Sequence, residues 1–312
     1  MKYIKKLSSK LLLALGALIL SVIVWQVIVS KRVIGDDEKI KQLQSIEQIQ
    51  ESLQNGELKT YRRIPCSPFT KIKTKVVSVL ILKGNEYAVY ENKYYGKNIE
   101  LTQNGDELLL SCSVRIRSTT TRPTLFIVMP EDPQLVACTP PEDFYFASCN
   151  LYGFRGDNTL LSCEGQYVAI DTDMPYINIS QKDNRLNLRT ASLDSTLRID
   201  NVRINVDAEK SWFRLFDQIS DSINVNIQLQ ESAITEKLKI NSKSKVGTLS
   251  LKGTLGKGTD KIKINSPGPC DSLIIQLTSP PGNAKLLLLS KGLSGRFEHI
   301  DCSENVAIAR EE

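Results

Sequence analysis

The sequence contains a single histidine, His299, among 312 residues, and none of its seven cysteines forms a CxxC pair. A Ser-His-Asp or Cys-His arrangement would have to use that one imidazole, which lies in a C-terminal segment without a regular pattern. A closed zinc site is built from histidines and closely spaced cysteines, which the chain lacks. We therefore expect no catalytic residue, no bound metal and no cofactor.

Beyond the N-terminal residues 1–32, the chain has no excess of basic over acidic residues. The chain has 40 lysines and arginines, six of them within residues 1–32, and all 35 aspartates and glutamates come later. The remainder of the chain is thus close to neutral. Nucleic-acid-binding domains normally carry a basic patch, so we expect no nucleic-acid partner.

What the chain does have is an uncharged apolar run from Leu11 to Val29, which includes Leu20 and Trp25. A helix of this length spans about 29 Å, close to the hydrocarbon core of a bilayer. We predict a transmembrane signal anchor over residues 11–31 that contacts the lipid bilayer. A cleaved signal peptide is an alternative, but its apolar core is shorter and ends in small residues; a buried core helix is another.

The flanks of this run predict its orientation. Four lysines precede it, whereas Lys31 and Arg32 follow it and are soon followed by acids. The positive-inside bias places residues 1–10 in the cytoplasm and the rest of the chain in the periplasm or outside the cell. We expect a single-pass protein of the inner membrane.

The segment from Asp36 to Asn55 places Ile40, Leu43, Ile46, Ile49 and Leu53 at steps of three or four. That spacing predicts a helix, with Asp36 or Asp37 as its cap and Gly56 just past its end. We expect a stalk helix within residues 32–60 that docks one face on the domain, with a short self-associating coiled coil as the alternative.

Beyond residue 75 the hydrophobic period changes to two, which indicates β-strands. The segment Glu107–Arg117 alternates cleanly, and Asn104-Gly105 before it suits a hairpin turn to a strand near Ile99. The run Lys75–Leu82 is apolar on both faces, so we expect it inside a sheet or between layers.

From about residue 151 short alternating strands recur, and between Ile240 and Leu288 their inward positions return roughly every 12 residues. This pattern predicts a parallel β-solenoid of about two strands per coil, with a sandwich of hairpins as the alternative. We expect a β-rich part over residues 61–150, followed by the solenoid and an irregular tail over 151–312.

Two stretches, KGNEYAVYENKYYGKNIELTQNGDELLLSCSVRI and TLFIVMPEDPQLVAC, precede the repeated strands. Together, over about residues 75–290, they resemble the putative adhesin family with a head GIN domain. The resemblance implies a right-handed β-solenoid in the envelope of Bacteroidetes-type bacteria, without assigned catalysis. The corners here are charged or bear cysteine, where that family has Gly-Ser-rich ones, and no site residue is carried over.

Two segments are candidates for sites. Ser211–Ser220 breaks the strand period and predicts a short helix, which either covers a solenoid edge or presents a partner-binding patch made of Trp212, Phe213, Leu215, Phe216 and Ile219. Asp171 and Asp173, with Asp157 nearby, would share a strand face as a calcium or acid/base pair, or would only satisfy backbone groups at corners.

Cysteines in an oxidising compartment are expected to pair, although the odd count leaves at least one unpaired or intermolecular. Cys138 and Cys149 bracket a short step rich in proline and aromatics, which makes them the candidate disulfide. Cys112 lies on the apolar face of its predicted strand and is expected to be core filler.

These features together predict a non-enzymatic, membrane-anchored β-solenoid that acts in adhesion or binds an envelope protein or glycan. Stacked strands give long rows of side chains suited to extended ligands. A structural accessory subunit of a membrane complex, or a homo-oligomer, is the alternative. A polysaccharide-active enzyme is the third hypothesis.

Overall fold

The computed structural model describes residues 18–28, 36, 45–93, 99–112, 125–142, 144–183, 185–190, 201–206, 211–217, 222–229, 235–242, 245–255, 261–265, 268–282 and 284–311. In this part of the chain strands dominate and form two sheets, of twelve and eleven strands. The prediction of a mainly β protein is confirmed.

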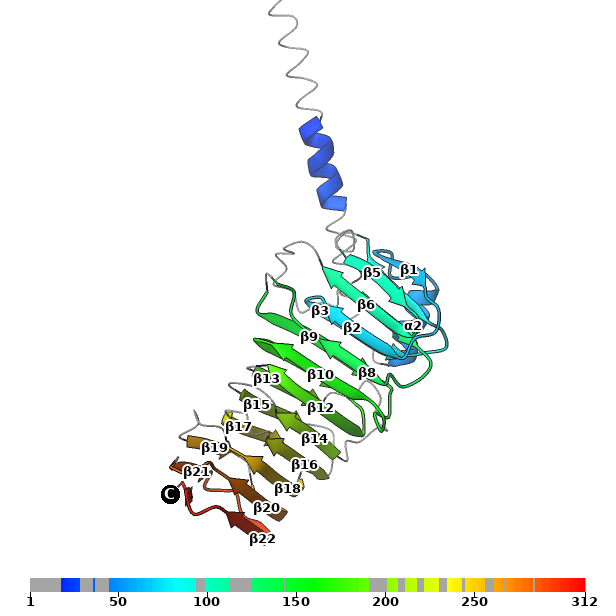
Figure 1. The fold of residues 1–312 in the computed structure, drawn as a ribbon. Helices are drawn as coiled ribbons and strands as arrows, with labels where there is room; N and C mark the ends of the chain where they lie inside the picture. Colours follow the sequence, from blue (N-terminus) through cyan, green and yellow to red (C-terminus); the bar gives the residue numbers. More distant parts are fainter. Residues whose placement is uncertain are drawn as a thin grey trace, which may run out of the picture.

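The strands of each sheet follow one another along one long axis (Figure 1). In spatial order, the twelve-stranded sheet consists of β1 (Tyr61–Pro65), β4 (Ala88–Asn92), β7 (Leu125–Met129), β3 (Ser78–Lys83), β9 (Phe146–Tyr152), β11 (Tyr167–Thr172), β13 (Arg185–Thr190), β15 (Ser211–Asp217), β17 (Thr235–Ser242), β19 (Lys261–Asn265), β21 (Lys285–Leu289) and β23 (Val306–Arg310). The eleven-stranded sheet consists of β22 (Gly295–Cys302), β20 (Cys270–Thr278), β18 (Lys245–Thr254), β16 (Ser222–Leu229), β14 (Asn201–Val206), β12 (Tyr176–Asp183), β10 (Leu160–Gly165), β8 (Leu135–Cys138), β2 (Lys71–Lys75), β6 (Glu107–Cys112) and β5 (Ile99–Asn104).

From β8 onward successive strands alternate between the two sheets, and each strand pairs in parallel with the next strand of its own sheet. One coil therefore adds one strand to each sheet, which is the two-strand parallel solenoid that the spacing predicts. Hairpins of a sandwich would pair antiparallel, so the alternative does not describe this part of the chain.

The core is built from columns of like residues between the sheets. Val168 and Ile170 of β11 pair in register with Leu186 and Leu188 of β13, and all four are buried. Since alternate strand residues point to opposite faces, one register sends every second side chain into the core. Each fully buried aliphatic side chain contributes about 1.5–3 kcal/mol.

The first coils contain antiparallel pairs. β5 and β6 form the predicted hairpin, with Gly105 in its turn at a φ of 58°. β3 lies between β7 and β9 and is buried on both faces, as its apolar run predicts. Its second face, which carries Leu80 and Leu82, packs in a separate cluster with the helix α2.

The helix α2 (Ile46–Gln54) covers this cluster through Ile49 and Leu53, both buried. The predicted docking and the predicted end before Gly56 are confirmed. Its start differs: the hydroxyl of Ser45 accepts a hydrogen bond from the Gln48 N–H and caps the helix. The carboxylate of Asp36 instead accepts bonds from the backbone and hydroxyl of Thr60.

Residues 18–28 are helical, with exposed apolar side chains that include Leu20 and Trp25. Leu11 and Val29 lie outside the described residues. Within the part that the structure describes, no helix is both long and apolar enough to cross a bilayer. The membrane anchor stays a prediction.

The predicted helix at Ser211–Ser220 is wrong. Ser211–Asp217 form strand β15, which pairs in parallel with β13 on one side and β17 on the other. Apolar residues three and four apart fit a helix, but a short segment gains more from ladders of backbone hydrogen bonds on both sides than from helix propensity.

The last coil ends the core with an ion pair. Glu298 and Arg310 follow Leu273 and Leu289 in their columns, and the guanidinium donates to both carboxylate oxygens, at 2.8 and 2.9 Å. A second guanidinium nitrogen donates to the carbonyl of Leu293, and the Glu298 carboxylate accepts from the Gly295 N–H. A charged pair thus occupies core positions of the last coil, so the end of the core does not expose a further layer of apolar side chains.

This ion pair predicts a pH dependence of the terminal coil. The hydrogen bond from Gly295 and the pairing with Arg310 lower the pKa of Glu298 below its usual value of 4.5. A lowered folded-state pKa stabilises above the unfolded pKa, and that contribution is lost as the pH falls through the folded one. We expect hydrogen-exchange protection of β22 and β23 to fall below about pH 4. The variant Glu298→Gln should have lost this dependence, and an unchanged pH profile in it would contradict the assignment.

Candidate binding faces of the solenoid

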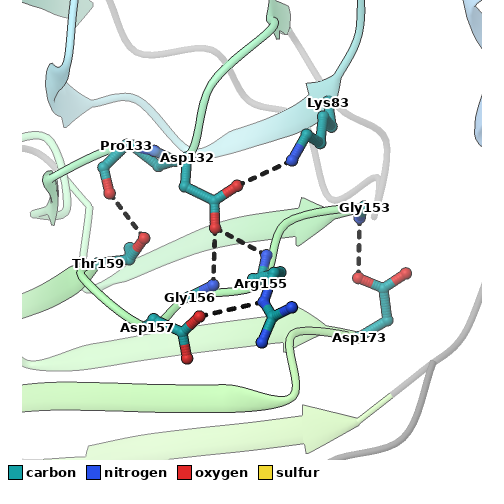
Figure 2. Close-up of polar contacts among 9 residues, drawn as sticks. All are labelled: Lys83, Asp132, Pro133, Gly153, Arg155, Gly156, Asp157, Thr159 and Asp173. Carbon is teal, nitrogen blue, oxygen red and sulfur yellow. Dashed lines mark hydrogen bonds and ion pairs between the residues drawn. The ribbon is translucent and has the colours of Figure 1, made fainter.

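Several aspartates lie in the loops that connect the strands, and Figure 2 shows the hydrogen bonds and ion pairs of their side chains. The carboxylate of Asp132 accepts hydrogen bonds from the backbone N–H groups of Arg155 and Gly156, both at 2.8 Å, and pairs with the Lys83 ammonium at 3.1 Å. The Thr159 hydroxyl donates to the Pro133 carbonyl beside it. Asp132 therefore ties two loops of successive coils to β3.

The three predicted acidic residues do not gather. Asp157 pairs with the side chain of Arg155, and Asp173 lies buried past the end of β11, where it accepts from the Gly153 N–H (Figure 2). Asp171 lies within β11, in register with Arg189; burial raises its pKa, and Arg189 opposes that shift. The described residues hold no cluster of His, Cys, Asp and Glu able to bind a metal ion.

The predicted disulfide between Cys138 and Cys149 is not formed. Both residues are buried thiols, but Cys138 lies on β8 and Cys149 on β9, in different sheets. Cys138 is instead in register with Cys163 of β10, and Cys149 with Ile170 of β11. The step between the two cysteines is the passage from one sheet to the other, so the chain needs no bridge to close it.

His299 lies on the edge strand β22, in register with Ile274, and its imidazole is exposed beside the side chain of Gln276 at 3.4 Å. Cys302 is three residues further on, at the end of that strand, and burial raises the pKa of its thiol. A raised thiol pKa keeps sulfur protonated, which is the reverse of what a nucleophile needs.

A groove crosses the outer face of the eleven-stranded sheet. It has a volume of about 330 Å³ and is lined by residues of four consecutive strands, β14, β16, β18 and β20: Arg203, Ile204, Asn226, Ile227, Gln228, Ser250, Lys252 and Ile274. Register pairing places Arg203, Asn226 and Ser250 in one column, and Gln228 and Lys252 in the next. The lining thus combines polar and basic side chains with three isoleucines, and it contains no carboxylate.

The outer face of the twelve-stranded sheet carries aromatic and cationic residues. The rings of Phe146 and Tyr167 lie 4.9 Å apart, and the Arg185 guanidinium lies 5.7 Å above the Tyr167 ring. The amide of Asn187 donates to the Tyr167 hydroxyl. We call these four residues the ring–guanidinium cluster. No sequence pattern marks it, because its members lie on three strands that only tertiary pairing brings together.

The predicted partner patch is divided by strand β15. Trp212 and Phe216 are in register with Arg185 and Arg189, which are exposed, whereas Phe213 and Leu215 are in register with Leu186 and Leu188, which are buried. Ile219 lies outside the described residues. Register thus pairs two of the five residues with exposed positions and two with buried ones, and the partner patch stays a prediction.

A loop-tying role for Asp132 predicts a stability effect. Asp132→Ala leaves two backbone N–H groups and one ammonium without their acceptor, so we expect the free energy of unfolding to fall by about 2–3 kcal/mol. Asp157→Ala removes one exposed ion pair on the same corner and should change it by less than about 1 kcal/mol. Chemical denaturation measures both, and equal effects would contradict the role.

The division of β15 predicts unequal effects within the patch. Phe213→Ala and Leu215→Ala alter core columns, and we expect each to lower the free energy of unfolding by about 2–5 kcal/mol. Trp212→Ala and Phe216→Ala alter outer columns and should lower the free energy of unfolding by clearly less. Thermal unfolding of the four variants checks the order, and the reverse order would mean that β15 is in another register.

No protein-family model matches the sequence, and no curated protein matches it. One solved structure similar to the chain is a "putative adhesin" from Bacteroides fragilis, with 10% sequence identity, coverage of 80% of this chain and 96% of that chain, and a TM-score of 0.29. Another is a "putative lipid binding protein" from Parabacteroides distasonis, with 9% identity, coverage of 81% of this chain and 96% of that chain, and a TM-score of 0.33. A "putative cell adhesion protein" from Clostridium sporogenes is also similar, with 12% identity, coverage of 80% of this chain and 99% of that chain, and a TM-score of 0.22. The adhesin names agree with the family that the sequence resembles.

Proposed function

We propose that this is a non-enzymatic protein of the cell envelope that binds an extended ligand along the outside of its solenoid. The observation that carries the proposal is the groove on the eleven-stranded sheet, which runs across four coils. Strands repeat at about 4.8 Å, so a ligand lying across them meets a new side chain at each coil.

The chemistry of the groove fits a polar, uncharged or anionic ligand. Asn226 and Gln228 each offer an amide donor and an amide acceptor, which match hydroxyl groups of a sugar or the backbone of a peptide. Asn226 is held in place because its amide donates to Asn201 of the preceding coil at 3.1 Å. Arg203 and Lys252 add two cations.

The proposed location is the outer side of the inner membrane, with the N-terminal run as the anchor. The support is the apolar sequence from Leu11 to Val29 together with the exposed apolar side chains of residues 18–28. Such a helix gains by burying these side chains in lipid. Two of the acids that an enzyme would use make corner contacts, because Asp157 pairs with Arg155 and Asp173 accepts from the Gly153 N–H.

Binding to a panel of purified envelope polysaccharides and peptidoglycan tests the proposal. The full-length protein in mild detergent should bind at least one member, and Gln228→Ala combined with Lys252→Ala should weaken that binding about ten-fold. The matched control is Gln134→Ala with Lys291→Ala, two exposed side chains outside the groove.

Three results would contradict the proposal. No binding to any member by the wild type, or binding unaffected by the groove variant, would remove the groove as a ligand site. Release of new reducing ends from a bound glycan would make the protein an enzyme. Stoichiometric recovery of a membrane protein, without any glycan binding, would favour a structural accessory subunit.

A further inference from the structure

The groove on the eleven-stranded sheet places its charges and its amides on different coils. Arg203 lies on β14, Asn226 and Gln228 lie on β16, and Lys252 lies on β18. Register pairing sets Asn226 beside Arg203 and Gln228 beside Lys252. Three successive coils therefore present a cation, a pair of amides and a second cation, in that order along the solenoid axis.

Both cations are open to a ligand. The side chains of Arg203 and Lys252 are exposed, and neither forms a hydrogen bond or an ion pair with a residue in the described part of the chain. Elsewhere on the same sheet the ammonium of Lys73 is paired with Glu107 at 2.7 Å. Since the described residues that line the groove include no acid, the potential there is positive and attracts an anion.

The amides between the cations offer donors and acceptors. Asn226 donates through its amide nitrogen to the side chain of Asn201 at 3.1 Å, which fixes the direction of its carbonyl oxygen. Gln228 is exposed and makes no hydrogen bond with the residues that the structure describes. An amide of a ligand that lies over β16 can therefore donate to one side chain and accept from the other.

The surroundings of the groove favour a glycan over other polymers. The strands β14, β16 and β18 are paired on both sides, so a peptide cannot join them as a further strand. Single-stranded nucleic acid stacks its bases on aromatic rings, and none is among the described lining residues. Ile204 and Ile227 are buried in the core, so Ile274 alone of the three lining isoleucines offers apolar surface, which is too little for an acyl chain.

We propose that the groove takes an acidic glycan in which a uronic acid alternates with an N-acetylated amino sugar. One carboxylate binds each of the two cations, and the N-acetyl amide between them binds over β16. This inference rests on the proposed function and names its substrate class. Coils recur at about 4.8 Å, close to the length of one sugar unit, so the cations on β14 and β18 are two units apart. The guanidinium of Arg203 binds a carboxylate in a bidentate manner, whereas the Lys252 ammonium acts as a point charge.

The test measures binding of hyaluronate oligosaccharides, in which glucuronate alternates with N-acetylglucosamine, to the full-length protein in mild detergent. We expect saturable binding that weakens as the salt concentration is raised. Arg203→Gln and Lys252→Gln should each weaken it about ten-fold. Arg203→Lys keeps the charge but loses the planar fork, so it should weaken binding less than Arg203→Gln. Thermal unfolding verifies that each variant folds.

Lys182 provides the matched control. It is an exposed lysine on β12, the strand next to β14 in the same sheet, and it does not line the groove. Lys182→Gln removes one positive charge from this sheet without altering the groove, and it should leave the binding unchanged. A loss equal to that of Lys252→Gln would mean that binding depends only on the charge of the sheet, and would overturn the proposal.

Further probes decide the class of ligand. A neutral oligomer of N-acetylglucosamine, and polygalacturonate with a carboxylate on every sugar, should each bind more weakly than hyaluronate. Equal binding of the first would overturn the need for carboxylates, and equal binding of the second would overturn the alternation. Tighter binding of oligodeoxythymidine, or of vesicles of phosphatidylcholine and phosphatidylglycerol, would assign the groove to nucleic acid or to membrane.

The outcomes also separate this inference from the proposed function. If hyaluronate fails to bind while an envelope glycan still binds through Gln228 and Lys252, this inference alone is wrong. If neither hyaluronate nor any member of the envelope panel binds, the groove is not a glycan site and both are wrong.

Discussion

The structure depends on one interaction, the in-register parallel pairing of each strand with the strand one coil away. This pairing stacks residues of the same face on one another, so Val168 and Ile170 meet Leu186 and Leu188 and a continuous core results. A single strand could not bury its apolar face alone; each coil is stabilised by its neighbours. The first coils add the helix α2 over β3, and the last coil ends the core with the charges of Glu298 and Arg310.

The same pairing determines what the outside of the molecule presents. Polar and charged residues are sorted into columns on two separate faces, one with a groove of amides and two cations, the other with rings and guanidinium groups. The nearly neutral composition of the chain beyond residue 32 conceals this separation, because acids such as Asp132, Asp157 and Asp173 are placed at corners, where they bind backbone and basic groups. Net charge describes the whole chain, whereas a ligand meets one face.

Local patterns predicted local structure well. Asn104-Gly105 gave the hairpin of β5 and β6, the doubly apolar run gave β3, and Gly56 marked the end of α2. The helix predicted at Ser211 was wrong because its apolar spacing suits a helix as well as a strand. Pairing with β13 and β17 makes the segment a strand. The predicted disulfide is not formed because residues close along the chain can lie apart in space, and Cys138 and Cys149 lie in different sheets.

By itself the sequence determined the class of the fold, since periodicity is a property of neighbouring residues and alternation requires a strand whose two faces differ. Only the tertiary structure decided which strands share a sheet, and therefore that Tyr167, Arg185 and Asn187 meet, and that β15 pairs with β13 and β17. Residues about 20 positions apart become neighbours through the length of each coil, and that length is set by corners whose geometry depends on contacts between coils.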